Sequence, residues 1–204
     1  SALIDEVVAL VKSLMGEFPQ APTGLIGYSM GGNFALRIAK QIPELTTLAV
    51  CPALSPEGTM LKISGNIIYE QYFLRKWRNL WSKKQTAFPQ HYNFSDAMNL
   101  SSITSLTDYF VKYHTEYDNT DDYFAAYDLS SGGLEGVTAK ILAAEDDPII
   151  PAKDYANLPD SISLDCVSRG GHGAFLENWQ FESWCDRYSC AFFRHALTNE
   201  RYPL

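Results

Sequence analysis

Residues 24–33 read GLIGYSMGGN, and this stretch decides how the rest of the chain is interpreted. Gly24–Tyr28 is a short apolar run, typical of a strand buried on both faces of a parallel sheet. Residues 30–41 follow at once with apolar side chains three and four positions apart, which predicts a helix. Between them, Ser29 stands in the pattern G-x-S-x-G, where small residues two places before and after it allow a sharp strand-to-helix turn. The hydroxyl of Ser29 should therefore project from the end of the strand, above the helix N-terminus.

The G-x-S-x-G pattern alone is a weak signal, and an ordinary glycine-rich strand–helix junction remains an alternative. If Ser29 is a nucleophile, the backbone N–H of Met30 is expected to be one donor to a developing oxyanion. A serine hydroxyl also needs a base, and that base needs an orienting acid. The rest of the chain must therefore supply both.

The segments on either side of this stretch predict an α/β fold, because helices and strands alternate in a way that is typical of a parallel sheet. The N-terminal segment is amphipathic, two later apolar runs (TAKILAA and SISLDCVS) read as buried strands, and the chain ends in a helix with aromatic residues on one side. The predicted helices are residues 2–18 and 178–197, and the further strands are residues 45–54, 138–144 and 161–168.

The alternation stops between residues 55 and 136, a stretch that holds more than half of the aromatic residues of the chain. It reads as helical segments joined by polar loops and inserted between two strands. We therefore divide the chain into residues 1–54, carrying the serine turn, a helical cap insertion at 55–136, and residues 137–204, carrying acid and base. The aromatics of the insertion either line an acyl pocket or pack the insertion's own core.

Asp147 and His172 are the candidates for acid and base, because each follows a predicted strand. Asp147 lies in EDDPIIP, where Pro148 fixes the loop. His172 lies in RGGHGAF, where glycines leave the backbone free to aim an imidazole. Asp146 could replace Asp147 as the acid, and both segments could also be plain surface turns. The occurrence of serine, acid and histidine in this order, each after a strand, favours a triad of Ser29, Asp147 and His172.

The other three histidines, His91, His114 and His195, lack such settings, and we expect them to lie on the surface or to pack helices.

Together, GYSMGGN (27–33), AAEDDPIIP (143–151) and RGGHGAF (169–175) resemble the YheT-like branch of the α/β-hydrolases. The aromatic segments YFL (72–74) and YFAAY (123–127) are similar to the cap of that family. The resemblance implies the C-terminal part of an α/β-hydrolase fold, a mostly parallel sheet flanked by helices, with a helical cap inserted between strands.

The resemblance also implies a serine hydrolase, with Ser29 as nucleophile, Asp147 as orienting acid and His172 as general base. Members of the family are described as hydrolases of carboxylic esters, some acting on acylglycerols or other acyl lipids. The expected substrate is therefore a small, lipophilic or acylglycerol-like ester, cleaved through an acyl-enzyme intermediate. No metal and no organic cofactor is implied.

Two alternatives remain for the function. The same triad could hydrolyse a thioester or a carbon–carbon bond, or the chain could be a non-catalytic, hydrolase-like binding module or an inactive fragment. Dehalogenase and epoxide-hydrolase chemistry is disfavoured, because those relatives need an aspartate where this chain has Ser29.

The chain departs from the family pattern at its start, where several strands would precede the first helix. One of the loops that would come with them normally supplies the second oxyanion donor, so we expect this donor to be absent from this chain and the chain to be a fragment. The strand at residues 24–28 would then expose an apolar edge. We expect self-association or a missing N-terminal segment to cover it.

Charge and composition exclude several classes of partner. The formal net charge of −8 argues against a nucleic-acid partner, and the cations of residues 75–84 read as a solvated helix face. The four cysteines show no metal-binding spacing, which favours free thiols in a reducing compartment. No apolar run approaches the ~20 residues that span a bilayer. We expect a cytoplasmic protein, although targeting upstream of residue 1 is not readable.

Overall fold

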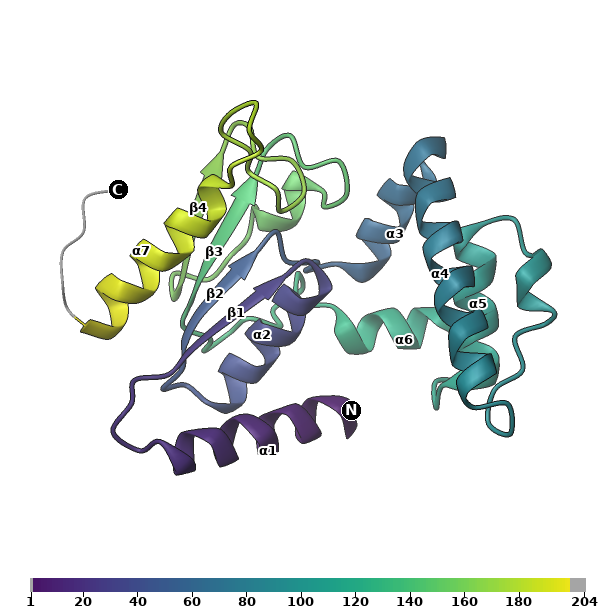
Figure 1. The fold of residues 1–204 in the computed structure, drawn as a ribbon, viewed down its shortest axis with the longest axis horizontal. Helices are drawn as coiled ribbons and strands as arrows, with labels where there is room; N and C mark the ends of the chain where they lie inside the picture. The colour runs from purple at the N-terminus through teal and green to yellow at the C-terminus, as the bar shows by residue number, and fades with distance from the viewer. Residues whose placement is uncertain (1, 199–204) are drawn as a thin grey trace. The chain divides into compact units, whose positions relative to one another are not determined.

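The computed structural model describes residues 2–198 and divides the chain into two compact units, which are described separately. Unit 1 is formed by Ser1–Leu54 and Leu129–Leu204, and unit 2 by Ser55–Asp128. Among the described residues, unit 1 contains the sheet, three α-helices and a short 3-10 helix (Ala152–Tyr155), whereas unit 2 is helical (Figure 1). Residues 129–136 therefore belong to the unit that carries the sheet.

The sheet of unit 1 is parallel throughout, and its strands follow one another in sequence order, β1-β2-β3-β4. Its central strands are buried at all but one position each, and Leu48 of β2 and Ile141 of β3 have no exposed surface. This burial explains their nearly continuous apolar sequences. The strands are β1 (Gly24–Tyr28), β2 (Thr46–Val50), β3 (Ala139–Ala144) and β4 (Ile162–Val167).

Helices α2 (Met30–Gln41) and α7 (Trp184–Thr198) cover opposite faces of β1. A Cβ at Gly24 would meet the ring of Phe193 in α7, whereas a Cβ at Gly27 would meet Ala35 in α2. Positions three residues apart in a strand point to opposite faces, so the two helices lie on different sides of the sheet.

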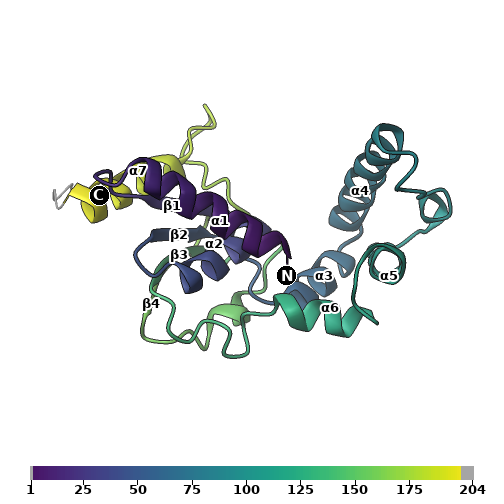
Figure 2. The same cartoon turned by 90° about the horizontal axis from the view of Figure 1, so that it is seen from below.

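Helix α1 (Ala2–Glu17) packs against α2, and Figures 1 and 2 both show the two helices as neighbours. Its apolar stripe packs against α2 and the loop that follows it. The buried members of this cluster are Ile4, Val8, Ile38, Ile42 and Leu45.

Strand β1 is an edge strand among the described residues, because its only partner in the sheet is β2. The side chains of Ile26 and Tyr28 are 38% and 42% exposed. What covers this edge, whether a second copy or another segment, stays a prediction.

The last helix begins at Trp184, so the expectation that it starts near Asn178 was wrong. Residues 176–183 instead form a loop closed by a bridge between Leu176 and Ser183. Within it, the side-chain oxygen of Asn178 accepts hydrogen bonds from the backbone N–H groups of Gln180 and Glu182. Asparagine competes with helix formation through such local bonds, which explains the later start.

Unit 2 contains four α-helices, and each begins at a side chain that caps it. Ser55, Asn66, Ser102 and Asn119 each accept a backbone N–H from the first turn, which satisfies donors that the helix itself leaves free. The helices are α3 (Pro56–Ser64), α4 (Ile67–Ala87), α5 (Ile103–His114) and α6 (Thr120–Tyr127).

An aromatic cluster forms the centre of unit 2. The rings of Trp81 and Phe94 stack with centroids 4.9 Å apart, and Phe110 stacks on Trp81 at 6.0 Å. The ring centroids of His114 and Phe94 lie 4.5 Å apart, and burial lowers the pKa of the His114 imidazole. These aromatic residues therefore pack the core of their own unit.

Among residues 2–198, no helix combines the length and the apolar character that crossing a membrane requires.

Candidate active site

Ser29 occupies a strained turn between β1 and α2. Its φ of 54° and ψ of −119° lie where residues with a side chain are rarely found. Four hydrogen bonds hold this turn. The N–H of Ser29 donates to Val50 O at 2.9 Å, and the carbonyl of Ser29 accepts from Gly32, Asn33 and Ala53. The neighbouring backbone thus over-determines the serine conformation, which is typical of strain kept at a functional position.

Gly27 and Gly32 make this turn possible, because a side chain at either would clash. A Cβ at Gly27 would overlap the carbonyl of Gly31 and lie 2.9 Å from the Cβ of Ala35. A Cβ at Gly32 would lie 2.9 Å from that of Pro52. A Cβ at Gly31 would meet no described atom within 4 Å. The expectation that both glycines of the pentapeptide are needed for sterics was therefore wrong for Gly31.

We predict that Gly27→Ala destabilises unit 1 by about 3 kcal/mol or more, since the clash involves backbone that cannot move away. Gly31→Ala is the matched control, and it should be neutral or stabilise the helix by up to about 1 kcal/mol. Urea unfolding followed by far-UV circular dichroism measures both. Equal stability of the two variants would contradict the steric role of Gly27.

His172 lies in the loop after β4, and its ring contacts both other triad candidates. Its Nε2 is 2.9 Å from Oγ of Ser29, and its Nδ1 is 2.8 Å from Oδ2 of Asp147. The flanking glycines, Gly171 and Gly173, have φ values of 59° and 81°, a region that glycine reaches at low cost. The structure thus brings Ser29, His172 and Asp147 into one hydrogen-bonded chain.

Asp147 follows β3 and is buried, with 3% of the residue exposed. Its Oδ1 accepts the backbone N–H groups of Ile149 and Ile150 at 2.7 and 2.9 Å, which leaves Oδ2 directed at His172. Burial alone would raise the pKa of this carboxyl, but the hydrogen bonds from His172, Ile150 and Ile149 lower it below its usual value. The group is therefore a carboxylate near neutral pH.

Asp146, the alternative acid, points elsewhere. Its Oδ1 accepts the backbone N–H groups of Gly170 and Gly171, each at 2.8 Å. These two bonds lower the pKa of the Asp146 carboxyl. The Asp146 side chain therefore holds the loop that carries His172 in place. This contact was not predicted from the sequence. The signal available was an acidic residue after one strand and a glycine-rich loop after the neighbouring strand.

Met30 is the first residue of α2, so its backbone N–H has no acceptor within the helix. It is the residue directly after Ser29, where a donor to an oxyanion would have to lie. The expectation that the second donor lies outside this chain stays a prediction.

Cys51 is a further buried residue beside the triad that the sequence did not single out. It follows β2 directly, adopts a φ of 44°, and is 1% exposed. Its Sγ lies 3.8 Å from Gly171 O, so the thiol reaches the loop that holds His172.

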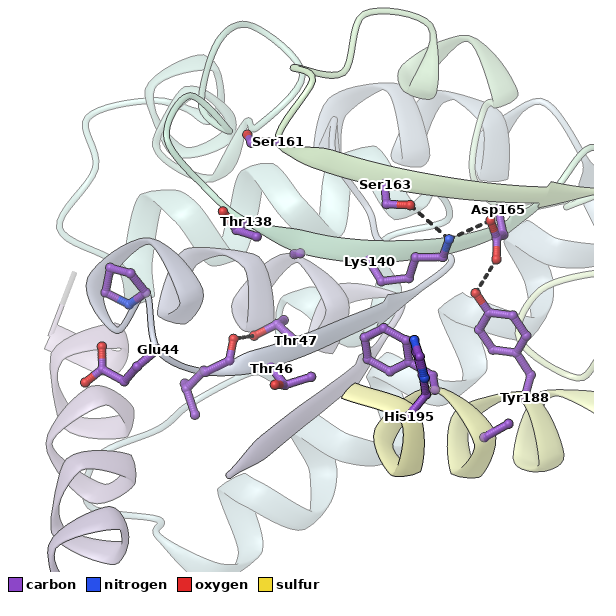
Figure 3. Close-up of a pocket in the computed structure, with 15 residues that line it drawn as sticks. Glu44, Thr46, Thr47, Thr138, Lys140, Ser161, Ser163, Asp165, Tyr188 and His195 are labelled. Atoms are coloured by element: carbon purple, nitrogen blue, oxygen red, sulfur yellow. Dashed lines mark hydrogen bonds and ion pairs between the residues drawn. The ribbon is translucent and has the colours of Figure 1, made fainter. Parts of the chain in front are cut away.

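A cavity of about 580 Å³ lies beside α7 near the N-terminal ends of the strands (Figure 3). The triad candidates lie at the C-terminal ends. Figure 3 shows two of its charged groups paired: Nζ of Lys140 contacts Asp165 at 2.6 Å and also donates to Oγ of Ser163 at 2.9 Å. The hydroxyl of Tyr188 donates to the second carboxylate oxygen of Asp165 at 2.5 Å. No triad residue lines this cavity, so it is separate from the candidate active site.

Solved structures that superpose on this chain include several hydrolases. An α/β fold hydrolase of Bacillus anthracis superposes with a TM-score of 0.57 at 18% identity, covering 95% of this chain and 74% of its own. An esterase of Pyrococcus furiosus gives 0.51 at 16% identity, covering 96% and 62%. This chain has the α/β-hydrolase fold. Identity at this level establishes the fold and leaves the reaction open.

The α/β-hydrolase assignment also agrees with sequence comparison. The chain is 26% identical over 182 residues to YheT of Escherichia coli (strain K12), a protein whose name marks it as a suspected esterase. The match covers 81% of this chain and 52% of YheT, so the chain spans about half the length of that relative. No family model matches the chain. The similarity supports placement in the α/β-hydrolase superfamily, as the resemblance of the three motifs predicted.

Proposed function

We propose that this α/β-hydrolase is a serine hydrolase that cleaves carboxylic ester bonds, with Ser29 as nucleophile, His172 as general base and Asp147 as the orienting acid. The observation that carries the proposal is the chain of two hydrogen bonds from Ser29 Oγ through His172 to Asp147, at 2.9 and 2.8 Å. Both lengths lie within the range for proton transfer between a nucleophile and its base.

In the first step, Oγ of Ser29 attacks the ester carbonyl while Nε2 of His172 takes the hydroxyl proton. The carboxylate of Asp147 stabilises the resulting imidazolium through Nδ1–H. The backbone N–H of Met30 donates to the oxyanion, aided by the positive end of α2. The imidazolium then gives its proton to the leaving alcohol, and an acyl-serine remains.

In the second step, a water molecule gives a proton to His172 and attacks the acyl-serine. Collapse of this intermediate returns the proton to Ser29 and releases the carboxylic acid. In both steps Ser29, His172 and Asp147 act as nucleophile, base and orienting acid, and the N–H of Met30 serves as one oxyanion donor.

We infer a lipophilic, acylglycerol-like ester as the substrate. Support comes from the motif resemblance to a family with acyl-lipid hydrolases and from the esterase designation in the name of YheT. A series of p-nitrophenyl esters of increasing acyl length tests this inference. We expect kcat/KM to rise with acyl length, and a preference for acetyl over longer chains would contradict it.

A fluorophosphonate probe tests the activated serine directly. We expect covalent labelling of the chain, loss of labelling in Ser29→Ala, and full labelling in Ser168→Ala, which changes an exposed serine. Absence of labelling in the folded wild-type chain would favour a binding module over an enzyme. Labelling that survives in Ser29→Ala would show that another serine is the nucleophile.

A further inference from the structure

We propose that Cys51, His172 and Asp147 form a binding site for a thiophilic divalent cation such as Zn²⁺ or Cd²⁺, and that the bound cation switches the active site off. The inhibition rests on the proposed hydrolase function, whereas the binding does not. The cation is an inhibitory ligand here and takes no part in ester cleavage.

The three side chains already converge. One ligand atom from each, the thiol sulfur, an imidazole nitrogen and a carboxylate oxygen, lie within 4.8 Å of one another. Sulfur and nitrogen ligands of a tetrahedral Zn²⁺ are about 3.6 Å apart, given bond lengths of about 2.3 and 2.0 Å. Ligand atoms at the upper limit of 4.8 Å would therefore have to approach by about 1.2 Å, whereas Nδ1 of His172 and Oδ2 of Asp147, now 2.8 Å apart, would have to separate to about 3.3 Å.

The donor set selects the kind of cation. A thiolate with an imidazole suits Zn²⁺ and softer ions, whereas Mg²⁺ and Ca²⁺ require oxygen ligands. Cys51 and Asp147 are 1% and 3% exposed, so water has little access to their ligand atoms and competes weakly with them for the ion. Three protein ligands leave a fourth position for water, as in open zinc sites.

The surrounding backbone holds two of the ligands in place. The N–H of Cys51 donates to Leu142 O at 2.7 Å, and Oδ1 of Asp147 is fixed by the N–H groups of Ile149 and Ile150. His172 is the adjustable member, since its side chain is 22% exposed. The glycines on either side of it have few steric restrictions on φ and ψ, so a small shift of the imidazole costs little.

Protons and charges balance without a redox step. Burial raises the pKa of the Cys51 thiol, so the free site holds S–H. The cation replaces that proton, which goes to solvent. The charges of thiolate and carboxylate then neutralise the 2+ charge of the ion.

Coordination would disable the base. Nδ1 of His172, which faces Asp147 at 2.8 Å, would give its lone pair to the ion. A neutral imidazole bound through Nδ1 carries its proton on Nε2. In that tautomer, Nε2 cannot accept the proton of Ser29, so attack on the ester stops.

The test of binding uses the Ser29→Ala variant and Cd²⁺ alone, so that no enzymatic activity is needed. We expect an ultraviolet thiolate-to-cadmium charge-transfer band at one equivalent. The affinity should fall at least about 100-fold when Cys51→Ser is added, since even outer-shell changes cost 10–100-fold. Cys185→Ser is the matched control, because Cys185 is also a buried free thiol, and it should leave the band unchanged. An undiminished band without Cys51 would overturn the proposal.

His172→Ala is the second variant, because it retains the thiol and changes a partly exposed loop residue. It should also weaken cadmium binding, and unchanged affinity would overturn the site as drawn. Circular dichroism and thermal unfolding check that each variant is folded.

The test of inhibition measures ester hydrolysis of the wild-type chain with added Zn²⁺ or Cd²⁺, each variant relative to its own metal-free rate. We expect inhibition that a chelator reverses and that Cys51→Ser largely removes. Binding without inhibition would overturn the switch. A chain that binds Cd²⁺ but hydrolyses no ester would contradict the proposed function and leave the metal site standing.

Discussion

His172→Ala should lower kcat for ester hydrolysis by about 10⁴–10⁶-fold, the range found when a triad base is removed. Without the imidazole, Oγ of Ser29 loses the base that lies 2.9 Å from it. The leaving alcohol also loses its proton donor. The binding of substrate should change far less, because the imidazole acts mainly in the transition state.

Steady-state kinetics with a p-nitrophenyl ester measure this loss, and His91→Ala, which changes an exposed histidine, serves as the control. The control should retain the wild-type rate. A His172→Ala variant that is folded and keeps more than about one hundredth of the wild-type kcat would be incompatible with general-base catalysis by this residue.

Asp147→Asn should lower kcat by about 10⁴-fold with little change in folding, as in triads where the acid becomes an amide. The backbone donors at Ile149 and Ile150 would hold the amide oxygen in the place of Oδ1. The amide nitrogen would then face Nδ1 of His172 and donate to it. The imidazole would carry its proton on Nε2, the tautomer that cannot activate Ser29.

Asp146→Asn is the matched control for this prediction. Its amide oxygen can still accept from Gly170 and Gly171, so the loop of His172 should remain fastened. We expect kcat to fall by about 10-fold or less, since the two hydrogen bonds remain and only the negative charge of their acceptor is removed. A larger loss in Asp146→Asn than in Asp147→Asn would assign the acid role to Asp146 instead.

The strands of the sheet could be predicted to within a few residues, because strands buried on both faces need continuous apolar runs. Ala139–Ala144 follows this rule directly. Gly24–Tyr28 forms a strand as predicted, but the expectation that it is buried on both faces was wrong, because it lies at the edge of the described sheet and three of its five residues are exposed. The strand expected at residues 45–54 ends earlier, at Val50. Its end is set by Cys51, whose φ of 44° leaves the extended region. Such a conformation depends on tertiary contacts and leaves no mark on hydrophobic periodicity.

The residues of the candidate site could be predicted from the sequence, but the hydrogen bonds that orient them could be predicted only in part. The order of serine, acid and histidine along the chain, each after a predicted strand, was enough to predict the triad candidates. The sequence favoured Asp147 as the acid, but it left Asp146 open as an alternative, because both occupy the same loop. The choice between them depends on which carboxylate the backbone N–H groups of Gly170 and Gly171 capture, a matter of hydrogen-bond geometry across two loops.

The insertion of unit 2 enters and leaves the sheet-bearing unit at adjoining residues. The N–H of Leu129 donates to the carbonyl of Leu54 at 2.7 Å, so one main-chain bond closes the gap across which 74 residues, Ser55–Asp128, are looped out. Because its two ends adjoin, the helical unit forms a self-contained insertion in the sheet-bearing unit. An insertion of different length could replace it while Ser29, His172 and Asp147, which all belong to the sheet-bearing unit, keep their places.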